Sequence, residues 1–496
     1  WPYNATLHRF RTSMLSEAIT SSLRQIDDLE LIEDPSRRKV YESDGLTAIA
    51  QMPPLVGLPN SLQALQAALR LCHSHGVPMV ARGAGTGLSG GATPLADGLL
   101  IGLAKFNRIL EIDPIKMTAR VEPGVTNLAI SKAVASAGLF YAPDPSSQIA
   151  CTIGGNVAEN SGGVHCLKYG LTLHNVCALK IMLADGEVLS LGGSGLWEDG
   201  LDLLALLHGS EGLLGLVIEV TVALRPLPEA VTVLMAGFRD TNAAANAVSA
   251  VIQAGVLPAG LEMMDRLAIQ AAEDFVHAGY PLEAEALLLC ELDGSGAEIA
   301  ALSAAVRAVL QAAGAQSLVE ASDAAARARL WLGRKAAFPA VGRIAPDYYC
   351  MDGTIPRRHL AEVLAAIADR SAHYGLPVAN VFHAGDGNLH PLILYDANDS
   401  DQFQRAEAFG ADVLAICLQF GGTITGEHGV GLEKIDQMCV QFSPLELAVF
   451  HAVKTAFDPS GLLNPGKAIP TLNRCAEFGA MHVHQGAEKH PELPRF

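Results

Sequence analysis

The chain has 496 residues, of which half are apolar and 17% are charged, and its net charge is −18. Its length allows two or three domains with sizeable cores. The acidic balance without a basic run excludes a nucleic-acid-binding protein, and no apolar window approaches the length of a membrane helix. We expect a cytoplasmic protein without a signal peptide, because Trp1-Pro2-Tyr3 shows neither a charged nor an apolar leader.

Composition and periodicity divide the chain into five segments. Residues 1–45 are interpreted as an N-terminal helical segment, 46–228 as one domain, and 229–424, with alanine-rich helices between strands, as a second. Residues 425–470 return to glycine-rich loops and one helix. Residues 471–496 form a polar tail, in which His482 and His484 are interpreted as exposed. The alternation of elements predicts an α+β fold that is divided near residues 225–228.

The first domain contains clear start and stop signals. Asn60-Ser61 caps a predicted helix over 62–75, which ends at Gly76. Strands are predicted at 77–81, 99–103, 109–112 and 119–121, a helix at 127–137, and a hairpin at 176–183 and 187–191. In the second domain, helices are predicted at 240–254, 296–313 and 359–373, with strands such as 286–292 and 378–382.

The stretch VARGAGTGLSGG, residues 80–91, contains G-x-G-x-x-G, a pattern often taken as a nicotinamide-binding turn. That turn needs a helix that starts inside the glycines, whereas Pro94 and a strand follow here, and Lys105 stands after the strand instead of an acid. Successive backbone N–H groups around glycines also form a concave anion nest. We therefore interpret the loop as a phosphate nest with Arg82 at its edge and hydroxyls from Thr86 and Ser89.

Two further glycine-rich segments follow. CTIGGNVAENSGG at 151–163 comes after PDPSSQ at 143–148, and its small side chains allow its backbone to approach a large flat ligand. The third segment is GSEGLLGLVIE at 209–219.

These three segments, in this order, resemble the flavin-binding domain of the vanillyl-alcohol oxidase (PCMH-type) family. The resemblance extends along the chain to its FAD-linked D-2-hydroxyacid dehydrogenase branch, which includes bacterial glycolate oxidases, through APDYYCMDGTIPRR, NVFHAGDGNLHPLI, GEHGVG and RCAEFGAMHVH. It implies a PCMH-type FAD-binding domain of two α/β subdomains, an antiparallel-sheet α+β cap domain for the substrate, and a C-terminal helical return. It also implies FAD, bound non-covalently because residues 82–91 lack histidine, with His165 as the alternative attachment point.

The resemblance places the first loop at the FAD pyrophosphate and the second along the isoalloxazine ring. The residues expected to hold FAD come from all three segments and the C-terminal return. They are Arg82, Gly83, Ala84, Gly85, Thr86, Gly87, Leu88, Ser89, Pro143, Pro145, Ser146, Thr152, Gly154, Gly155, Asn156, Asn160, Ser161, Gly163, Glu211, Gly212, Ile218 and Asn464.

The stretch HAGDGNLH, residues 383–390, holds two histidines, an aspartate and an asparagine within eight residues. Strands are predicted on both sides, at 378–382 and 391–395, and a four-residue turn at 385–388 places His383 directly opposite His390. Opposed side chains in a sheet have Cβ atoms about 4.5–5.5 Å apart, which suits two ligands of one metal ion. From this hairpin alone, a structural histidine pair is an equal alternative.

A third ligand is offered by TGEHGVG at 425–431, where Glu427 and His428 stand between glycines. Two histidines and one carboxylate leave coordination positions open, as a catalytic ion requires, and zinc, iron(II) and manganese all accept them. The resemblance implies that Glu427 is a metal ligand and His428 the general base. It also implies that Arg334 binds the substrate carboxylate, with a surface arginine on a helix as the alternative.

The expected reaction is oxidation of a small 2-hydroxy acid. The substrate chelates the metal, His428 takes the hydroxyl proton, and a hydride passes to N5 of the flavin. Family members that handle a second substrate carboxylate have a basic residue where this chain has Cys350, which favours glycolate or D-lactate over 2-hydroxyglutarate. Tyr348 and Tyr349 are candidates for narrowing the pocket, with buried packing as an equal alternative.

Nine cysteines without a C-x-x-C pair argue against a disulfide framework and against a self-contained iron–sulfur cluster. We expect most of them to be buried in a reducing compartment. The resemblance implies electron transfer through a second flavin subunit and an iron–sulfur subunit towards quinone, with membrane contact at the inner face only through these partners. The alternatives are a stand-alone D-lactate or D-2-hydroxyglutarate dehydrogenase and a non-catalytic flavin subunit that relays electrons.

Overall fold

The computed structural model describes residues 15–193, 200–471 and 474–475. The N-terminal residues Trp1-Pro2-Tyr3 and the tail histidines His482 and His484 therefore lie outside the described residues. Among the helices within these ranges, none combines the length and apolar character needed to cross a membrane.

A four-stranded sheet, in the order β1-β2-β4-β3, opens the fold. β2, β3 and β4 run parallel, and β1 pairs antiparallel with β2, so the segment before residue 46 contributes a strand as well as helices. Its elements are α1 (Glu17–Arg24), β1 (Leu29–Ile32), α2 (Pro35–Arg38), η1 (Lys39–Tyr41), β2 (Leu55–Pro59), α3 (Leu62–Ser74), β3 (Met79–Arg82) and β4 (Leu99–Gly102).

The helix α3 shows why local signals predicted this part well. The Ser61 hydroxyl accepts a hydrogen bond from the Ala64 N–H, and Gly76 adopts the left-handed φ of +65° just after the helix. The buried face of α3 packs on the first sheet through Leu65, Leu69 and residues of the same phase.

A five-stranded antiparallel sheet, in the order β5-β6-β10-β8-β9, follows. The predicted hairpin is β8 and β9, and Gly186 takes the φ of +80° that its turn requires. The elements of this part are β5 (Ile109–Asp113), β6 (Thr118–Val121), α4 (Asn127–Val134), η2 (Ala135–Ala137), β7 (Leu139–Phe140), α5 (Ile153–Glu159), α6 (Cys166–Tyr169), η3 (Thr172–Asn175), β8 (Val176–Met182), β9 (Val188–Gly192), α7 (Leu203–Leu207), β10 (Leu216–Ala223) and β11 (Arg225–Pro226).

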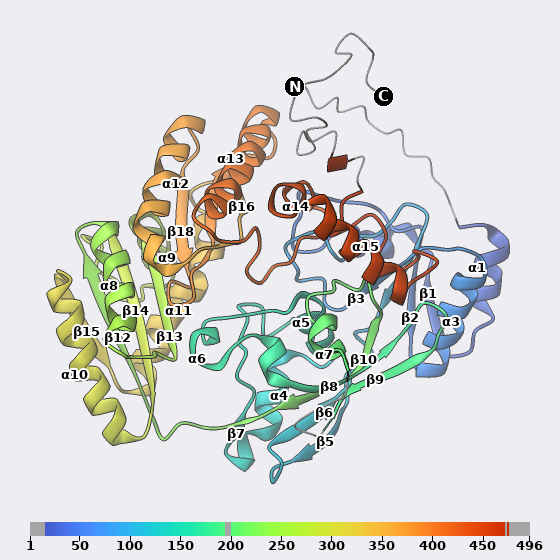
Figure 1. The fold of residues 1–496 in the computed structure, drawn as a ribbon, viewed down its shortest axis with the longest axis horizontal. Helices are drawn as coiled ribbons and strands as arrows, with labels where there is room; N and C mark the ends of the chain where they lie inside the picture. Colours follow the sequence, from blue (N-terminus) through green and yellow to red (C-terminus); the bar gives the residue numbers. More distant parts are fainter. Residues whose placement is uncertain (1–14, 194–199, 472–473, 476–496) are drawn as a thin grey trace.

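The cap domain is built on a seven-stranded antiparallel sheet, in the order β15-β12-β14-β13-β18-β20-β16, which lies at the left of Figure 1. Its elements are β12 (Ala230–Phe238), α8 (Thr241–Gln253), β13 (Gly260–Asp265), α9 (Arg266–Val276), β14 (Ala286–Gly294), α10 (Gly296–Ala312), β15 (Ser317–Ala321), α11 (Ala324–Val341), β16 (Asp347–Cys350), β17 (Gly353–Thr354), η4 (Arg357–His359), α12 (Leu360–Tyr374), β18 (Val378–Phe382), β19 (Asn388–Leu389), β20 (Pro391–Tyr395) and α13 (Ser400–Gln419).

Helices cover both faces of this sheet, so its strands are apolar on both sides. On β12, Val233 and Met235 belong to the core that includes α9 and α11, whereas Leu234 and Ala236 belong to the core that includes α8, α10, α12 and α13. This alternation follows from the two-residue period of a strand. The same alternation determines towards which face of the sheet each polar side chain points.

The C-terminal return completes the first sheet. After α14 (Ile435–Gln441) and α15 (Pro444–Phe457), drawn in red in Figure 1, the chain runs back beside β3. The Met79 N–H donates to the Leu462 carbonyl at 2.7 Å, and the Asn464 N–H donates to the Met79 carbonyl at 2.8 Å. Residues far apart in the sequence thus form one wall near the predicted phosphate loop.

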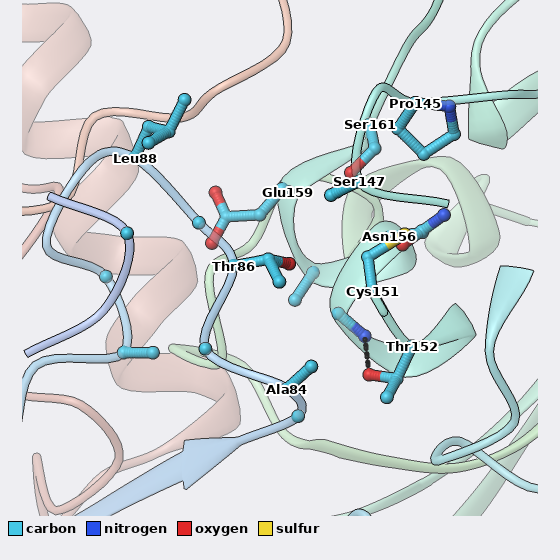
Figure 2. A pocket seen from close by; sticks show the side chains of 18 of the residues that line it. Ala84, Thr86, Leu88, Pro145, Ser147, Cys151, Thr152, Asn156, Glu159 and Ser161 are labelled. Carbon is cyan, nitrogen blue, oxygen red and sulfur yellow. Dashed lines mark hydrogen bonds between the residues drawn. The ribbon is translucent and has the colours of Figure 1, made fainter. Parts of the chain in front are cut away.

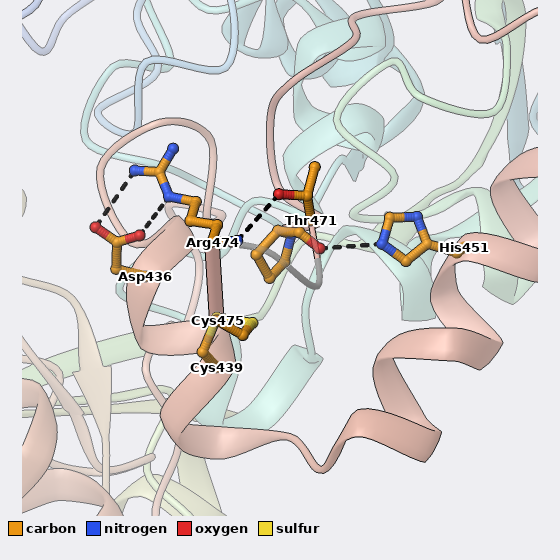
Figure 3. Close-up of a disulfide and its surroundings, with 7 residues drawn as sticks. Asp436, Cys439, His451, Thr471, Arg474 and Cys475 are labelled. Atoms are coloured by element: carbon orange, nitrogen blue, oxygen red, sulfur yellow. Dashed lines mark hydrogen bonds and ion pairs between the residues drawn. A yellow bond between two sulfur atoms is a disulfide. The ribbon is translucent and has the colours of Figure 1, made fainter. Parts of the chain in front are cut away.

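One disulfide corrects the expectation from the cysteine count. Cys439 on α14 is bonded to Cys475, and Arg474 pairs with Asp436 beside it (Figure 3). Spacing rules detect cysteines that are close in sequence, whereas these two are 36 residues apart and meet only because the chain folds back. The other seven cysteines, all in described residues, are free, and five of them are buried.

Candidate active site

One cavity of about 630 Å³ is bordered by all three glycine-rich segments, by the cap domain and by the GEHGVG loop. Figure 2 shows the part in which Ala84 and Thr86 of the first loop lie opposite Thr152 and Asn156 of the second segment, with Leu88 further along the loop. The predicted phosphate loop and the predicted metal ligands therefore open into the same space.

Most residues predicted to hold FAD line this cavity: Arg82, Gly83, Ala84, Gly85, Thr86, Gly87, Leu88, Pro145, Ser146, Thr152, Gly154, Gly155, Asn156, Ser161, Glu211 and Gly212. The remaining ones are described by the structure but stand outside the lining: Ser89, Pro143, Asn160, Gly163, Ile218 and Asn464. Asn464 shows what such a residue does, because its side-chain amide donates to the carbonyls of Gly91 and Glu211 and joins two walls.

The first loop is irregular from Gly83 to the start of β4, as expected for a nest rather than a nicotinamide-binding turn. Gly85 has a φ of +72°, and a Cβ there would come within 2.2 Å of the Arg82 guanidinium. Arg82 lines the cavity and donates to the Ser43 carbonyl at 2.7 Å. Burial lowers the pKa of Arg82, and the guanidinium supports the loop from within.

The second glycine-rich segment lies close to the first loop because the residues at which they meet have small side chains. The Thr152 hydroxyl caps α5 by accepting from the Gly155 N–H. A Cβ on Gly83 would lie 2.2 Å from the Thr152 hydroxyl, and one on Gly154 would lie 2.6 Å from Pro123. Glycine is required at both positions by close approach.

Two acids connect the cofactor side of the cavity to the GEHGVG loop. Glu211 accepts from the N–H groups of Val430 and Gly431, each at 2.7 Å. Burial and the neighbouring Glu211 raise the pKa of Glu159, which lines the cavity, well above its usual range. Sequence patterns did not single out Glu159.

His383 and His390 lie together, but in a hairpin register that differs from the prediction. The His383 N–H donates to the Asn388 carbonyl at 3.1 Å, so the turn comprises residues 384–387 and His383 stands opposite Asn388. His390 is the diagonal neighbour. Because the shift is two residues, both histidines keep the predicted common face, and their ring centroids are 5.0 Å apart.

This common face is the one that carries α11. Val381 of β18 and Leu392 of β20 belong to the α9–α11 core, and His383 and His390 follow in the same phase. Glu262 on β13 has the phase of Met264, which belongs to the same core. The sheet therefore directs these three polar side chains towards α11.

Glu427 completes the predicted ligand set. Its Oε1 lies 3.3 Å from His383 Nε2 and 3.0 Å from His390 Nε2, and the possible ligand atoms lie within 4.8 Å of one another. Burial would raise the pKa of Glu427, but both histidines hold it well below its usual range. Two imidazole nitrogens that converge on one carboxylate fit a divalent ion with open coordination positions.

Asp352, which the sequence analysis missed, fixes the loop that carries Glu427 and His428. Its fully buried carboxylate accepts from the His428 N–H at 2.9 Å, the Thr425 hydroxyl at 2.6 Å and the Asn388 amide at 2.8 Å. Lys434, equally buried, lies 3.1 Å away. Burial would raise the pKa of Asp352, but Lys434 leads the charges that hold it well below its usual value.

His428 packs parallel to His390, with ring centroids 4.8 Å apart. Its Nδ1 is buried and has no hydrogen-bond partner in the described part of the chain. Burial lowers the pKa of His428 to about 4, which the nearby Asp352 only partly offsets. His428 is therefore neutral near pH 7 and is able to accept a proton.

Arg334 is 2% exposed, which rules out a surface arginine. Its Nη2 lies 2.6 Å from Glu262 Oε2, and its buried Nε has no partner among the described residues. Glu262 is 1% exposed, and its Oε1 lies 2.9 Å from His383 Nδ1. Glu262 is the third residue that the sequence analysis missed, after Glu159 and Asp352, although a lone acid inside an apolar strand was the available signal.

Aromatic side chains close the space beside Arg334. Phe338 follows one helical turn after Arg334 on α11 and lines the cavity, with its ring centroid 6.3 Å from that of His390 and 6.2 Å from that of Tyr348. Tyr348 lines the cavity, as proposed from the sequence. Cys350 is buried and groups with His390 and His428.

His165 does not face the cavity. Its ring nitrogens lie 3.0 Å from Asp144 and 2.9 Å from Glu291, which joins the FAD-binding side to β14 of the cap sheet. Among the described residues it thus serves as a contact between domains.

Comparisons with known proteins agree with this geometry. A family model described as "FAD binding domain" matches residues 53–192, and one described as "FAD linked oxidases, C-terminal domain" matches residues 227–468. The chain is similar to "Glycolate oxidase subunit GlcD" of Escherichia coli K12, with 58% identity over 98% of this chain and 97% of that protein. It is 39% identical to the Bacillus subtilis subunit of the same name, over 92% of this chain and 97% of that one.

More distant relatives and solved structures extend the comparison. "D-lactate dehydrogenase" of Anaerostipes hadrus is 32% identical over 84% of this chain and 89% of its own. The structure of p-cresol methylhydroxylase matches with a TM-score of 0.78 and 18% identity, over 92% of this chain and 98% of that one. 4-Ethylphenol oxidase from Gulosibacter chungangensis matches with a TM-score of 0.76 and 19% identity, over 92% and 99%. The PCMH-type α+β fold expected from the sequence is confirmed.

Proposed function

The chain belongs to the PCMH-type family of FAD-linked oxidases and is an FAD-dependent hydroxyacid oxidoreductase, and we propose that it oxidises glycolate to glyoxylate with the help of a divalent metal ion. The observation that carries the proposal is the meeting of the FAD loops with His383, His390, Glu427 and His428 in one cavity. The names of the two 58% and 39% identical relatives support glycolate as the substrate.

The residues present fit both groups that the reaction needs. Bound FAD supplies a hydride acceptor, and a divalent ion supplies a Lewis acid beside the substrate hydroxyl. The nest over residues 83–87 would hold the pyrophosphate, and His383, His390 and Glu427 would hold the ion. Zinc, iron(II) and manganese remain equal candidates, because all three accept nitrogen and carboxylate ligands.

His428 is assigned the proton transfer. Its ring is neutral at physiological pH, lines the cavity and packs against the ligand His390. It accepts the hydroxyl proton of the substrate while the hydride leaves the α-carbon, so the alcohol loses two electrons and two hydrogens, one hydrogen from oxygen and one from carbon. Asp352 keeps the ring in place through the backbone of the loop.

Arg334 is assigned the substrate carboxylate. Its buried Nε faces no protein acceptor in the described structure, and a guanidinium pairs with a carboxylate through charge-assisted hydrogen bonds. Phe338 and Tyr348 supply an apolar wall at this end of the cavity, which suits the short carbon chain of a small monocarboxylic acid.

The reduced flavin needs an electron acceptor outside the chain, because the nine cysteines include no C-x-x-C spacing for a cluster. We therefore propose that a second flavin subunit and an iron–sulfur subunit carry the electrons towards quinone at the inner face of the cytoplasmic membrane. The word "subunit" in the names of the two relatives supports a complex. The isolated chain is then expected to reduce artificial dyes but to reduce quinone poorly.

Anaerobic titration of the purified, FAD-loaded chain with glycolate tests the proposed reaction. The visible flavin absorbance should bleach with one equivalent of glyoxylate formed for each flavin. D-lactate and D-2-hydroxyglutarate serve as parallel substrates. Bleaching by D-lactate alone would establish the D-lactate dehydrogenase activity that the 32% identical relative carries, and bleaching by none of them would favour a relay subunit.

A further inference from the structure

We propose that Glu262 is a positioning residue that couples the metal centre to the substrate-carboxylate site. It is a single buried carboxylate placed between the proposed metal ligand His383 and the proposed carboxylate binder Arg334. The inference rests on the proposed function, because it needs an ion at His383, His390 and Glu427.

The first contact sets the ring of His383. Glu262 Oε1 lies 2.9 Å and Oε2 3.0 Å from His383 Nδ1, so this nitrogen carries the proton and Nε2 is left to face Glu427. A ligating histidine that donates its second N–H to a carboxylate is fixed in tautomer and orientation, and its basicity towards the metal rises.

The second contact sets the guanidinium of Arg334. Its Nη2 lies 2.6 Å from Glu262 Oε2, and both side chains are almost fully buried. An isolated buried guanidinium is unfavourable, and Glu262 supplies the opposite charge that makes this position stable. With Nη2 paired to Glu262, Nε is a buried donor without a partner among the described residues and is offered to a substrate carboxylate.

The two contacts use one rigid support. Glu262 lies on β13, in the interior of the seven-stranded sheet between β14 and β18, and Arg334 lies on α11, which packs on the same face. A displacement of the carboxylate towards either partner changes its distance to the other. Metal binding and substrate binding are therefore linked through Glu262, and such linkage is reciprocal.

Glu262→Gln tests the inference, with FAD-loaded protein and with Zn²⁺ or Mn²⁺ titrated into chelator-treated samples. The amide removes the negative charge that Glu262 presents to His383 and Arg334, so metal affinity should fall by about 10–100-fold. The KM for glycolate should rise more than kcat falls, because Arg334 loses its orientation in the ground state as well as in the transition state. Glu262→Asp, which keeps the charge but is one methylene shorter, should recover part of the metal affinity.

Glu291→Gln is the matched control. Glu291 is a buried acid on the neighbouring strand β14, and it contacts His165 and Trp331 outside the metal set. This variant should keep both the metal affinity and the KM of the wild type. If Glu262→Gln fails to accumulate, Glu262→Asp alone carries the metal and KM measurements.

Two results would overturn the inference in distinguishable ways. Wild-type metal affinity and KM in Glu262→Gln and Glu262→Asp, with an ion bound in the wild type, would refute the role of Glu262 alone. A wild-type chain that binds no divalent ion would refute the proposed metal centre and the coupling with it.

Discussion

His428 is the side chain whose removal should affect catalysis most directly. The variant His428→Ala should keep FAD and the metal ligands, since its side chain is in neither set. Loss of a general base slows the chemical step by about 10²–10⁴-fold. Stopped-flow mixing with glycolate under anaerobic conditions measures the flavin reduction rate, and a rate near that of the wild type would assign the base elsewhere.

Phe338 should set the upper size of the substrate. Phe338→Ala removes the ring that lies against His390 and Tyr348 and opens the end of the cavity beside Arg334. A pocket of this kind discriminates one methylene by about 10–200-fold, so the ratio of kcat/KM for D-2-hydroxybutyrate to that for glycolate should rise by at least about tenfold. The exposed Leu332, on the same helix, is the control position. An unchanged ratio would place the size limit in another residue.

Some residues of the candidate site could be predicted from the sequence, and others could not. His383, His390, Glu427 and His428 were found because short glycine-bounded motifs carry them, and they do line one cavity. Glu262 belongs to no short sequence motif. Its partners Arg334 and His383 are 72 and 121 positions away in the chain. The pairing of β13 with β18 brings Glu262 beside His383, and the packing of α11 on the sheet brings Arg334 to both.

At the scale of elements, the hairpin around residues 384–387 explains why a prediction with an incorrect register still placed His383 and His390 on one face. Side-chain direction in a strand depends on parity, so an error of two residues preserves the face while changing the opposed pair. The helix over 62–74 was predicted closely because its signals are local, in Ser61 and Gly76. The disulfide and the loop anchored by Asp352 depend on contacts across the chain, and local patterns do not encode them.

The GEHGVG loop should depend on Asp352 for its stability. Asp352→Asn leaves Lys434 buried with its main partner neutralised, which costs about 3–5 kcal/mol of unfolding free energy. The control is Asp436→Asn, which breaks the partly exposed pair with Arg474 and should cost about 1 kcal/mol or less. Denaturant unfolding measures both variants. Equal losses of unfolding free energy in the two variants would show that the buried Asp352–Lys434 pair contributes no more to stability than the partly exposed pair.

At the scale of the whole molecule, ionic contacts hold the cap against the FAD-binding side. His165 bridges Asp144 and Glu291, and Lys168 and Tyr169 both reach Asp293. Burial would lower the pKa of His165, but Asp144 leads the interactions that raise it well above its usual value. The protonated imidazole is therefore part of the junction between the domains.

This junction should make stability depend on pH. A histidine with a raised folded pKa contributes fully below its unfolded value of about 6.5, and the contribution is lost as pH rises towards the folded value. The melting temperature of the wild type should therefore exceed that of His165→Gln by less at pH 9 than at about pH 6. His373→Gln, at an exposed site on α12, is the control. A difference that is constant over this range would show that His165 is not charged in the folded protein.

The central claim is that one cavity holds FAD and a divalent ion at His383, His390 and Glu427 for the oxidation of a 2-hydroxy acid. The most direct measurement is anaerobic flavin bleaching by glycolate in FAD-loaded protein, before and after removal of the metal by a chelator. Bleaching should be lost in the metal-free protein and restored by one equivalent of Zn²⁺ or Mn²⁺ in the wild type but not in His390→Ala. Bleaching at the original rate in metal-free protein would contradict the account.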